Sequence, residues 1–179
     1  VEELINNHPD VQIFGPKNIE FKFKYTIVKE DDVISILGTK VKFNIIETPG
    51  HTLDHIIYVD TDHLFCGDTL FNLGCGRMFE GNPEMFWDSL KKIKSLPEDT
   101  QVYCAHEYTE ANLKFCQSID PDNQELAKQA EIIKELRLKG EATVPFSLGD
   151  NLKSNPFLRA DTKELQAIMG LDNPAEVFG

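Results

Sequence analysis

The chain has 179 residues, of which 41% are hydrophobic and 27% are charged, a composition typical of one soluble globular domain with or without a small helical extension. Its formal net charge of −12 repels nucleic acid and anionic membrane surfaces, so we expect neither as a partner. No apolar run approaches the roughly 18 residues that cross a bilayer. The chain starts at Val1 rather than Met and enters a helix-like segment at once, which suggests a fragment or a processed chain.

Strand-like segments dominate the first two thirds of the chain. Alternation and β-branched residues predict strands over 11–15, 21–28, 33–37, 40–47, 55–60, 63–68 and 101–106. Gly38 and Thr39 separate two of these runs, as in a hairpin. Residues 82–95 predict a helix, because Asn82 suits the N-cap, Pro83 suits the first helical position, and apolar residues then recur at helical spacing.

The last third of the chain has a mostly helical pattern. It predicts helices over 108–118, 122–138 and 161–169, with a loop over 144–157. The second helix is expected to stop at Lys139 and Gly140, a cation followed by a helix-ending glycine. We therefore expect a layered, sheet-based domain over 1–106 and a helical part over 107–179, unless the later helices simply pack on the sheet.

The chain has four cysteines, and no two of them form a C-x-x-C pair or a zinc-finger spacing. They are Cys66, Cys75, Cys104 and Cys116. Most lie in or beside apolar stretches, so we interpret them as small buried hydrophobes in a reducing compartment, which suits the cytoplasm. A catalytic thiol is the less favoured alternative.

Three apolar strands each end by delivering a potential metal ligand. His51 follows "FNIIETPG", Asp68 follows "HLFCG", and His106 follows "QVYCA". Loops at strand ends are where rigid scaffolds hold reactive groups, and imidazole and carboxylate are ligands that zinc, iron and manganese accept. Gly50 and Gly67 precede two of the three and allow close backbone turns. Each residue alone could be a surface histidine or a turn-capping aspartate, but together they predict a metal site.

The other histidines are weaker candidates. His8 lies in a polar helix-end segment, and His63 opens a strand beside a turn, so both are expected to be exposed. His55 begins a strand four residues after His51, and we expect it to support the ligands rather than to bind metal.

Five segments together resemble one known family. They are "ETPGHTLDHI", "FCGDTLF", "GCGRMFEG", "YCAHEYT" and "NPFLR". In this order they resemble glyoxalase II, the hydroxyacylglutathione hydrolases of the metallo-β-lactamase superfamily. The resemblance implies an α+β fold, a four-layer αββα sandwich that is incomplete at its N-terminal side, with a two-metal site at one edge. It also implies a helical C-terminal part that helps to bind substrate.

The resemblance also implies a role for each matching residue. His51 would bind one metal, His106 the other, and Asp68 would bridge both and serve catalysis. The substrate-binding residues would be Arg77, Phe79, Tyr108 and Arg159, although the family often has Tyr where Phe79 stands. The cofactor would be zinc, two ions per complete site, with iron or manganese as alternatives.

The implied reaction is hydrolysis of the thioester S-D-lactoylglutathione to D-lactate and glutathione, in methylglyoxal detoxification. A hydroxide shared by the two metals would attack the thioester carbonyl. This agrees with the absence of a Ser-His or Cys-His arrangement in the sequence. We expect a cytoplasmic, monomeric enzyme whose partner is the small-molecule glutathione thioester.

The sequence departs from the family at both ends. The family's T-H-x-H-x-D-H motif is absent before "VEELINNHPD", and no basic segment follows "NPAEVFG". Only three expected ligands remain, and His51 and His106 would sit on different ions. We therefore expect activity to belong to a longer parent protein and to be doubtful for this chain alone. The alternatives are a mononuclear iron persulfide dioxygenase and a non-catalytic remnant.

Overall fold

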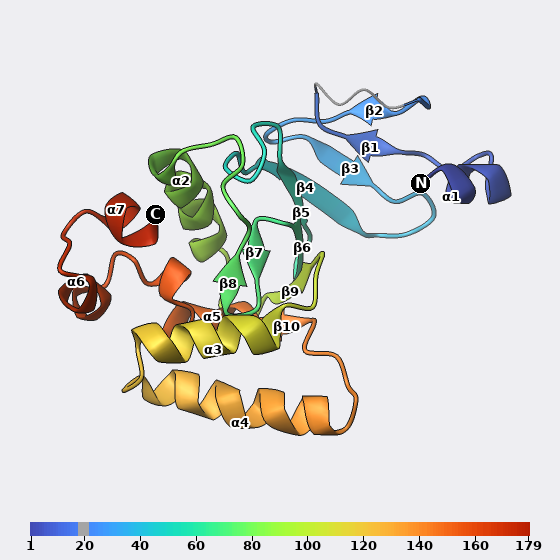
Figure 1. Cartoon of the computed structure of the whole chain (residues 1–179). Helices are drawn as coiled ribbons and strands as arrows, with labels where there is room; N and C mark the ends of the chain where they lie inside the picture. The colour runs from blue at the N-terminus through green and yellow to red at the C-terminus, as the bar shows by residue number, and fades with distance from the viewer. Residues whose placement is uncertain (18–21) are drawn as a thin grey trace.

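The computed structural model describes residues 1–17 and 22–179 (Figure 1). Its elements, in chain order, are α1 (Glu2–Asn7), β1 (Phe14–Gly15), β2 (Thr26–Ile27), β3 (Val33–Ser35), β4 (Lys42–Glu47), β5 (Ile56–Val59), β6 (His63–Gly67), β7 (Leu70–Phe71), β8 (Gly74–Cys75), α2 (Pro83–Lys94), β9 (Gln101–Cys104), α3 (Thr109–Ile119), α4 (Gln124–Leu138), β10 (Phe146–Ser147), α5 (Leu148–Ser154), the 3-10 helix η1 (Pro156–Leu158), α6 (Lys163–Met169) and α7 (Pro174–Phe178). This is an α+β arrangement, as predicted. Within the described ranges, no helix is both long and apolar enough to cross a membrane.

A six-stranded sheet organises the fold, with strand order β10-β9-β6-β5-β4-β3. Neighbouring strands are antiparallel except for β6 and β9, which run parallel. On one face, Ile57, Leu64 and Val102 are fully buried and pack against α2, which contributes Phe86 and Leu90. Burying each such side chain stabilises the fold by about 1.5–3 kcal/mol, so this face holds the main core.

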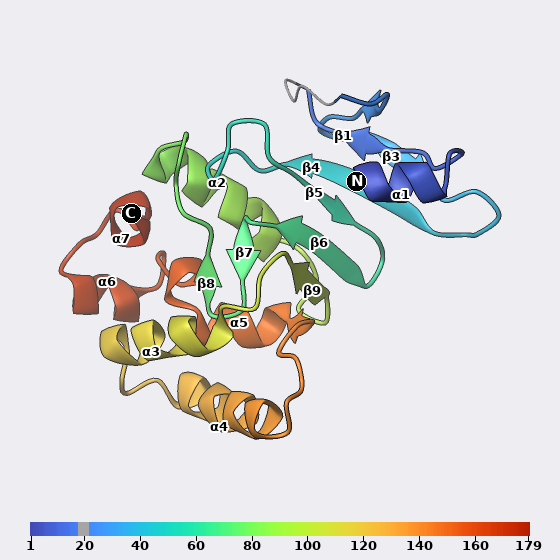
Figure 2. The ribbon, with the colours of Figure 1, turned by 45° about the vertical axis from the view of Figure 1, so that its right-hand side comes forward.

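The opposite face of the sheet is less completely covered. The two-stranded ribbon β1–β2 lies over its β3–β4 end, where Val28, Ile34 and Ile45 form a small separate core. Figures 1 and 2 show this ribbon and α1 at one end of the molecule, away from the C-terminal helices. Further along the same face, the ring of Phe65 stacks on Tyr103 with centroids 4.9 Å apart and stays 40% exposed. The predicted sandwich is therefore present with one extended sheet and, among the described residues, only a short ribbon opposite it.

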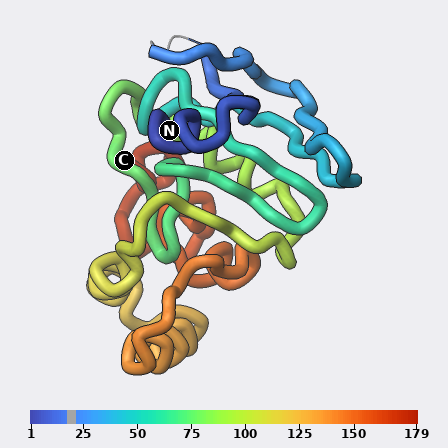
Figure 3. The backbone as a smooth tube through the Cα atoms, turned by 90° about the vertical axis from the view of Figure 1, so that its right-hand side faces the viewer, coloured from blue at the N-terminus to red at the C-terminus, as the bar shows by residue number. Residues whose placement is uncertain are grey.

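Helices α3 and α4 lie at the other end of the molecule from α1 (Figure 3). Helices α3 and α4 pack together over a small core that includes Leu73, Cys116 and Leu126. Helix α7 returns to α2, where the ring of Phe178 meets Phe86 edge-to-face at 5.2 Å. These contacts join the helical part to both the β7–β8 hairpin and the main core.

Most of the predicted elements are confirmed, including β4, β5, β6, β9 and the three long helices. Asn82 caps α2 as predicted, since its side chain accepts a hydrogen bond from the N–H of Met85 at 2.9 Å. The predicted strands over 11–15 and 21–28 shorten to β1 and β2, and the beginning of the second lies outside the described residues. Helix α7 was not predicted.

The predicted loop over 144–157 is wrong, because it contains β10, α5 and η1. Two side chains cap these short helices: Ser147 accepts from the N–H of Asp150, and Asn155 accepts from the N–H of Phe157. Caps of this kind satisfy backbone donors that a short helix leaves open. Polar and glycine residues that look loop-like in sequence thus form helix ends that pack on the sheet.

Candidate active site

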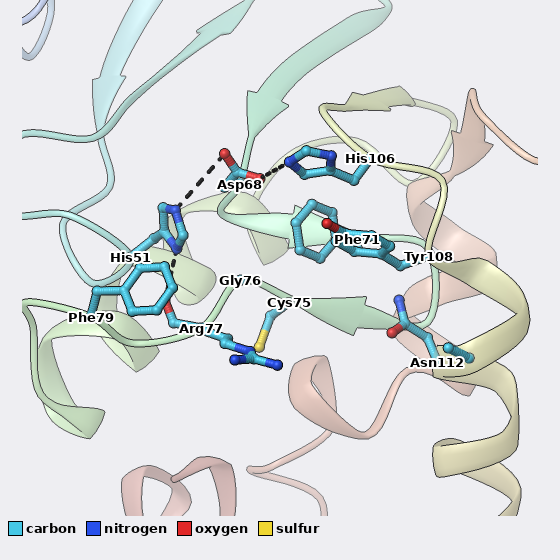
Figure 4. A pocket seen from close by; sticks show the side chains of 11 residues that line it. His51, Asp68, Phe71, Cys75, Gly76, Arg77, Phe79, His106, Tyr108 and Asn112 are labelled. Carbon is cyan, nitrogen blue, oxygen red and sulfur yellow. Dashed lines mark hydrogen bonds and ion pairs between the residues drawn. The ribbon is translucent and has the colours of Figure 1, made fainter.

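The three predicted ligands converge because of the sheet topology. Strands β4 and β6 are each antiparallel to β5, and β9 is parallel to β6. All three therefore run in the same direction, and their C-terminal ends meet at one edge of the sheet. His51, Asp68 and His106 follow these ends and lie together there (Figure 4).

The carboxylate of Asp68 lies between the two imidazoles. Its Oδ2 is 3.8 Å from Nε2 of His51, and its Oδ1 is 3.2 Å from Nε2 of His106. Each carboxylate oxygen therefore faces a different ring (Figure 4). The side chains of His51, Asp68 and His106 are 17%, 30% and 47% exposed, so the cluster is open on one side rather than enclosed by the core.

The ring of His51 is held in a form suited to metal binding. Its Nδ1 lies 2.7 Å from the carbonyl oxygen of Arg77, which can only accept, so Nδ1 carries the proton and donates it. The lone pair of a neutral ring is then on Nε2, which points toward Asp68. Ligating histidines generally fix their second nitrogen in this way.

The donor types fit a divalent metal, but their number is small. In the part of the chain that the structure describes, no group of three or more His, Cys, Asp or Glu side chains is arranged so that it could hold a metal ion by itself. His51 and His106 stand on opposite sides of Asp68 rather than around a common point. The three residues thus match part of a two-metal site better than a complete one-metal site.

Glycines allow the backbone to approach these ligands closely. A Cβ on Gly76 would lie 1.9 Å from the carbonyl oxygen of Asp68 and 3.2 Å from Nδ1 of His51. Gly67 has φ +52°, in the left-handed region that other residues rarely adopt. Side chains at these positions would push apart the turns that carry the ligands.

A cavity of about 640 Å³ opens beside the cluster, a size that suits a small-molecule substrate. Its lining residues are His51, Asp68, Phe71, Cys75, Gly76, Arg77, Phe79, His106, Tyr108, Ala111 and Asn112. The ring of Tyr108 stacks on His106 at 4.9 Å, and the ring of Phe79 lies 5.0 Å from His51. The guanidinium of Arg77 forms no ion pair with the residues described here, so it is free to meet an anion.

The structure brings Arg77, Phe79 and Tyr108 to this cavity, but it places Arg159 elsewhere. Arg159 forms an ion pair with Asp120, and the two side chains are only 12% and 9% exposed. Its guanidinium thus pairs inside the fold and does not line the cavity, and its expected contact with substrate stays a prediction. Sequence reasoning also missed Asn112, whose amide donates to the carbonyl oxygen of Asn72 at 3.0 Å.

His55 lies behind the cluster rather than in the cavity. Its Nε2 accepts a hydrogen bond from the backbone N–H of Asp68 at 3.3 Å. Burial, and then the nearby ring of His51, lower the pKa of His55, which favours a neutral ring near pH 7. This agrees with the expectation that His55 supports the ligands.

The four cysteines are free thiols, and the predicted burial is confirmed for two of them. Cys66 and Cys116 are buried, while Cys75 and Cys104 are half-buried. Burial raises the pKa of Cys116 to about 12, and it also raises the pKa of Cys75, the thiol that lines the cavity. Protonated thiols are weak nucleophiles, so the cavity has no activated cysteine.

The fold agrees with the comparisons to known proteins. Residues 3–106 match the metallo-beta-lactamase superfamily, and residues 107–179 match the hydroxyacylglutathione hydrolase C-terminus. Similar solved structures include ETHE1 from Myxococcus xanthus, with 24% identity and a TM-score of 0.62 over 96% of this chain and 63% of that one. A metallo-beta-lactamase from Staphylococcus aureus has 18% identity and a TM-score of 0.60 over 98% of this chain and 45% of its own. The chain is thus a member of the metallo-beta-lactamase superfamily, in which divalent metal binding is general.

Sequence relatives narrow this class. The chain is 46% identical to a hydroxyacylglutathione hydrolase from Pseudoalteromonas translucida, over 94% of the chain and 65% of the relative. It is 43% identical to one from Pseudomonas fluorescens, over 98% of the chain and 71% of the relative. The chain therefore belongs to the hydroxyacylglutathione hydrolase family, glyoxalase II, and spans about two thirds of the length of these relatives.

Proposed function

We propose that the chain carries part of the active site of a metal-dependent thioester hydrolase. Its reaction is the conversion of S-D-lactoylglutathione and water to D-lactate and glutathione, in methylglyoxal detoxification. The observation that carries the proposal is the meeting of His51, Asp68 and His106 at one sheet edge, beside a cavity lined by Arg77, which forms no ion pair among the described residues. Family membership supports the same reaction, since the relatives are named hydroxyacylglutathione hydrolases.

His51 and His106 would each bind one metal, and Asp68 would bind both. Zinc is the proposed metal, two ions in a complete site, and iron or manganese suit the same donors. Metal bound there supplies an activated water at neutral pH and positive charge for the oxygen of the thioester carbonyl. A complete two-metal site would need further ligands in addition to these three residues.

The chain's own residues bind and orient the substrate around this centre. The guanidinium of Arg77 would pair with a carboxylate of the glutathione moiety, as a planar cation does well. Tyr108 and Phe79 flank the two candidate histidines and would pack against the substrate's apolar atoms, keeping bulk water from the thioester. His51 keeps its Nε2 lone pair available because the carbonyl of Arg77 holds its other nitrogen.

Residues 107–179 are proposed to be the substrate-binding part. They contribute Tyr108 to the cavity and stabilise the hairpin that leads to Arg77. In this second role, Asn151 accepts from the N–H of Leu73 at 2.8 Å, and Asn155 donates to the carbonyl of Gly74 at 3.0 Å. Both asparagines are almost fully buried, so the hairpin is fixed by the helical part.

We also propose a cytoplasmic, monomeric protein that takes a small-molecule thioester and neither nucleic acid nor a membrane as partner. The four free thiols suit a reducing compartment. The net charge of −12 disfavours polyanions.

The direct test is hydrolysis of S-D-lactoylglutathione by the purified chain after incubation with Zn²⁺, Mn²⁺ or Fe²⁺. Metal-dependent turnover that is lost in Asp68→Asn, with the native circular dichroism spectrum retained, supports the proposal. Bound iron with oxygen consumption on glutathione persulfide, and no thioester hydrolysis, would instead indicate the dioxygenase.

A non-catalytic chain is the second candidate function. It is favoured by the lack, among the described residues, of a group of three donors that could hold a metal alone. Such a chain would bind glutathione or its thioester at Arg77 and Tyr108 without turnover. Isothermal titration with S-D-lactoylglutathione separates the two, because binding without hydrolysis under all three metals supports this candidate alone.

A further inference from the structure

His55 occupies a junction of three strand ends. It immediately precedes β5, and its carbonyl accepts from the N–H of Thr48 at 2.8 Å, which pairs the end of β4 with the start of β5. Its Nδ1 lies 3.1 Å from Oγ1 of Thr48 and 3.0 Å from Oγ1 of Thr69. The two hydroxyls are 3.0 Å apart, and both threonines are fully buried. The ring thus meets a closed pair of hydroxyls on one side.

The other side of the ring meets the backbone of a candidate ligand. Nε2 of His55 accepts the N–H of Asp68 at 3.3 Å. Because Nε2 accepts, a neutral ring must carry its proton on Nδ1 and donate it to the threonine hydroxyls. In a doubly protonated ring, or in the other tautomer, an N–H at Nε2 would face the backbone N–H of Asp68, and two donors cannot form a hydrogen bond. Only one form of His55 therefore satisfies both sides.

The turn that delivers Asp68 is shaped around this ring. Gly67 has φ +52°, and a Cβ there would lie 3.0 Å from Nε2 and 3.2 Å from Cε1 of His55. The ring therefore packs directly over the residue before Asp68. Rotation of this turn would move the Asp68 carboxylate away from one of its two imidazole neighbours.

We propose that His55, as the neutral Nδ1–H tautomer, is the positioning residue for Asp68. It links the buried hydroxyls of Thr48 and Thr69 to the Asp68 amide and so holds the carboxylate between His51 and His106. This inference rests on the proposed function only in treating those three residues as metal ligands. Groups that orient ligands from behind commonly change metal affinity by about 10–100-fold when they are removed.

Two substitutions separate positioning from a role in stability alone. His55→Asn keeps an amide donor near the Nδ1 position, for the threonines, but removes the acceptor that faces Asp68. His55→Gln places a carbonyl near the Nε2 position and can still accept from the Asp68 amide. We expect His55→Asn to exchange the Asp68 amide hydrogen faster and to bind Zn²⁺ about 10–100-fold more weakly in chelator competition. His55→Gln should stay near wild type in both, even if its melting temperature is the lower of the two.

His63 provides the matched control, since it opens β6 and its ring pairs with Asp60 at 3.0 Å, away from the cluster. His63→Asn and His63→Gln should leave the Asp68 amide and Zn²⁺ affinity unchanged. If both His55 variants weaken Zn²⁺ binding equally, in proportion to their loss of melting temperature, His55 is merely structural and the proposal fails.

The ring itself gives a test that needs no metal. Long-range ¹H–¹⁵N spectra of the whole chain should show the neutral His55 ring protonated at Nδ1, and the Nε2–H tautomer would overturn the proposal. Should wild type bind no Zn²⁺, the proposed function fails while this spectrum and the Asp68 exchange rate still decide the role of His55. Should the His55 variants not fold, Thr69→Val against Thr69→Ser asks the same question, with faster Asp68 exchange expected only in the valine variant.

Discussion

Two charged clusters, each containing a residue from the sequence motifs, differ in how their charges are paired. The Arg159–Asp120 pair is buried and satisfied within the chain, since the two side chains bond to each other and Asp120 also accepts from Asn123 at 3.0 Å. The His51–Asp68–His106 cluster is open to a cavity, and its carboxylate has two imidazole neighbours but, among the residues that the structure describes, no ion pair with Lys or Arg. The buried ion pair is part of the folded structure, whereas the carboxylate of the open cluster remains able to bind a cation or a ligand. The difference predicts that substitutions will separate stability from function.

The largest effect is expected for Asp68→Ala in the metal-loaded protein. Loss of the carboxylate that faces both histidines should lower metal content and reduce kcat on the order of a thousandfold, about 4 kcal/mol of barrier. Metal analysis and steady-state kinetics measure the two. Asp62→Ala, in an exposed turn, is the control and should change neither. Full metal content and full activity in Asp68→Ala would remove this residue from the site.

Arg159→Ala should have the next largest effect, and on stability. It leaves the Asp120 carboxylate buried without its cation, a change that costs about 3–5 kcal/mol. Urea denaturation should show the loss, with Zn²⁺ affinity of the folded protein unchanged. Arg137→Ala breaks a more exposed pair with Glu110 and should cost below about 1 kcal/mol. Native stability with a raised KM in Arg159→Ala would instead return Arg159 to the substrate site.

The contrast between the clusters also marks what the sequence can predict. Strands such as β4, β5 and β6 alternate clearly, and His51, Asp68 and His106 are visible as residues that follow apolar runs. Their convergence is not visible, because it depends on β4, β6 and β9 sharing one direction, which only the sheet order decides. The ion pair of Arg159 was not visible for a related reason: its partner is 39 residues away in sequence, and no local pattern links them. The missed helix α5 has a Ser cap and a glycine, which locally favour a loop.

A smaller effect is expected for Arg77→Ala. Arg77, like Arg159, is an arginine, but it lines the cavity beside the open cluster. Its side chain forms no ion pair among the described residues, so stability should change by less than about 0.5 kcal/mol. KM for the glutathione thioester should rise about tenfold with kcat little changed, because the lost contact is similar in ground and transition states. The backbone carbonyl that holds His51 remains in the variant. Arg77→Lys keeps the charge and should recover part of the affinity, and an unchanged KM in Arg77→Ala would contradict the assignment.

The smallest effect is expected for Asp60→Asn, in a third cluster that is closed like the Arg159 pair but lies at the surface. Burial raises the pKa of Asp60, but hydrogen bonds from the N–H groups of Asp62 and His63 and from the His63 ring outweigh it, so the pKa is lowered overall. A lowered native pKa means that the charged form stabilises the fold above the ordinary value of 3.8 and that this contribution is lost as pH falls through the native pKa. Asp60→Asn should therefore cost below about 1 kcal/mol at pH 7, and its difference from wild type should shrink toward zero in urea denaturation at progressively lower pH. A difference that stays constant down to pH values well below 3.8 would show that the charge of Asp60 contributes nothing, and that the turn is held by its uncharged hydrogen bonds alone.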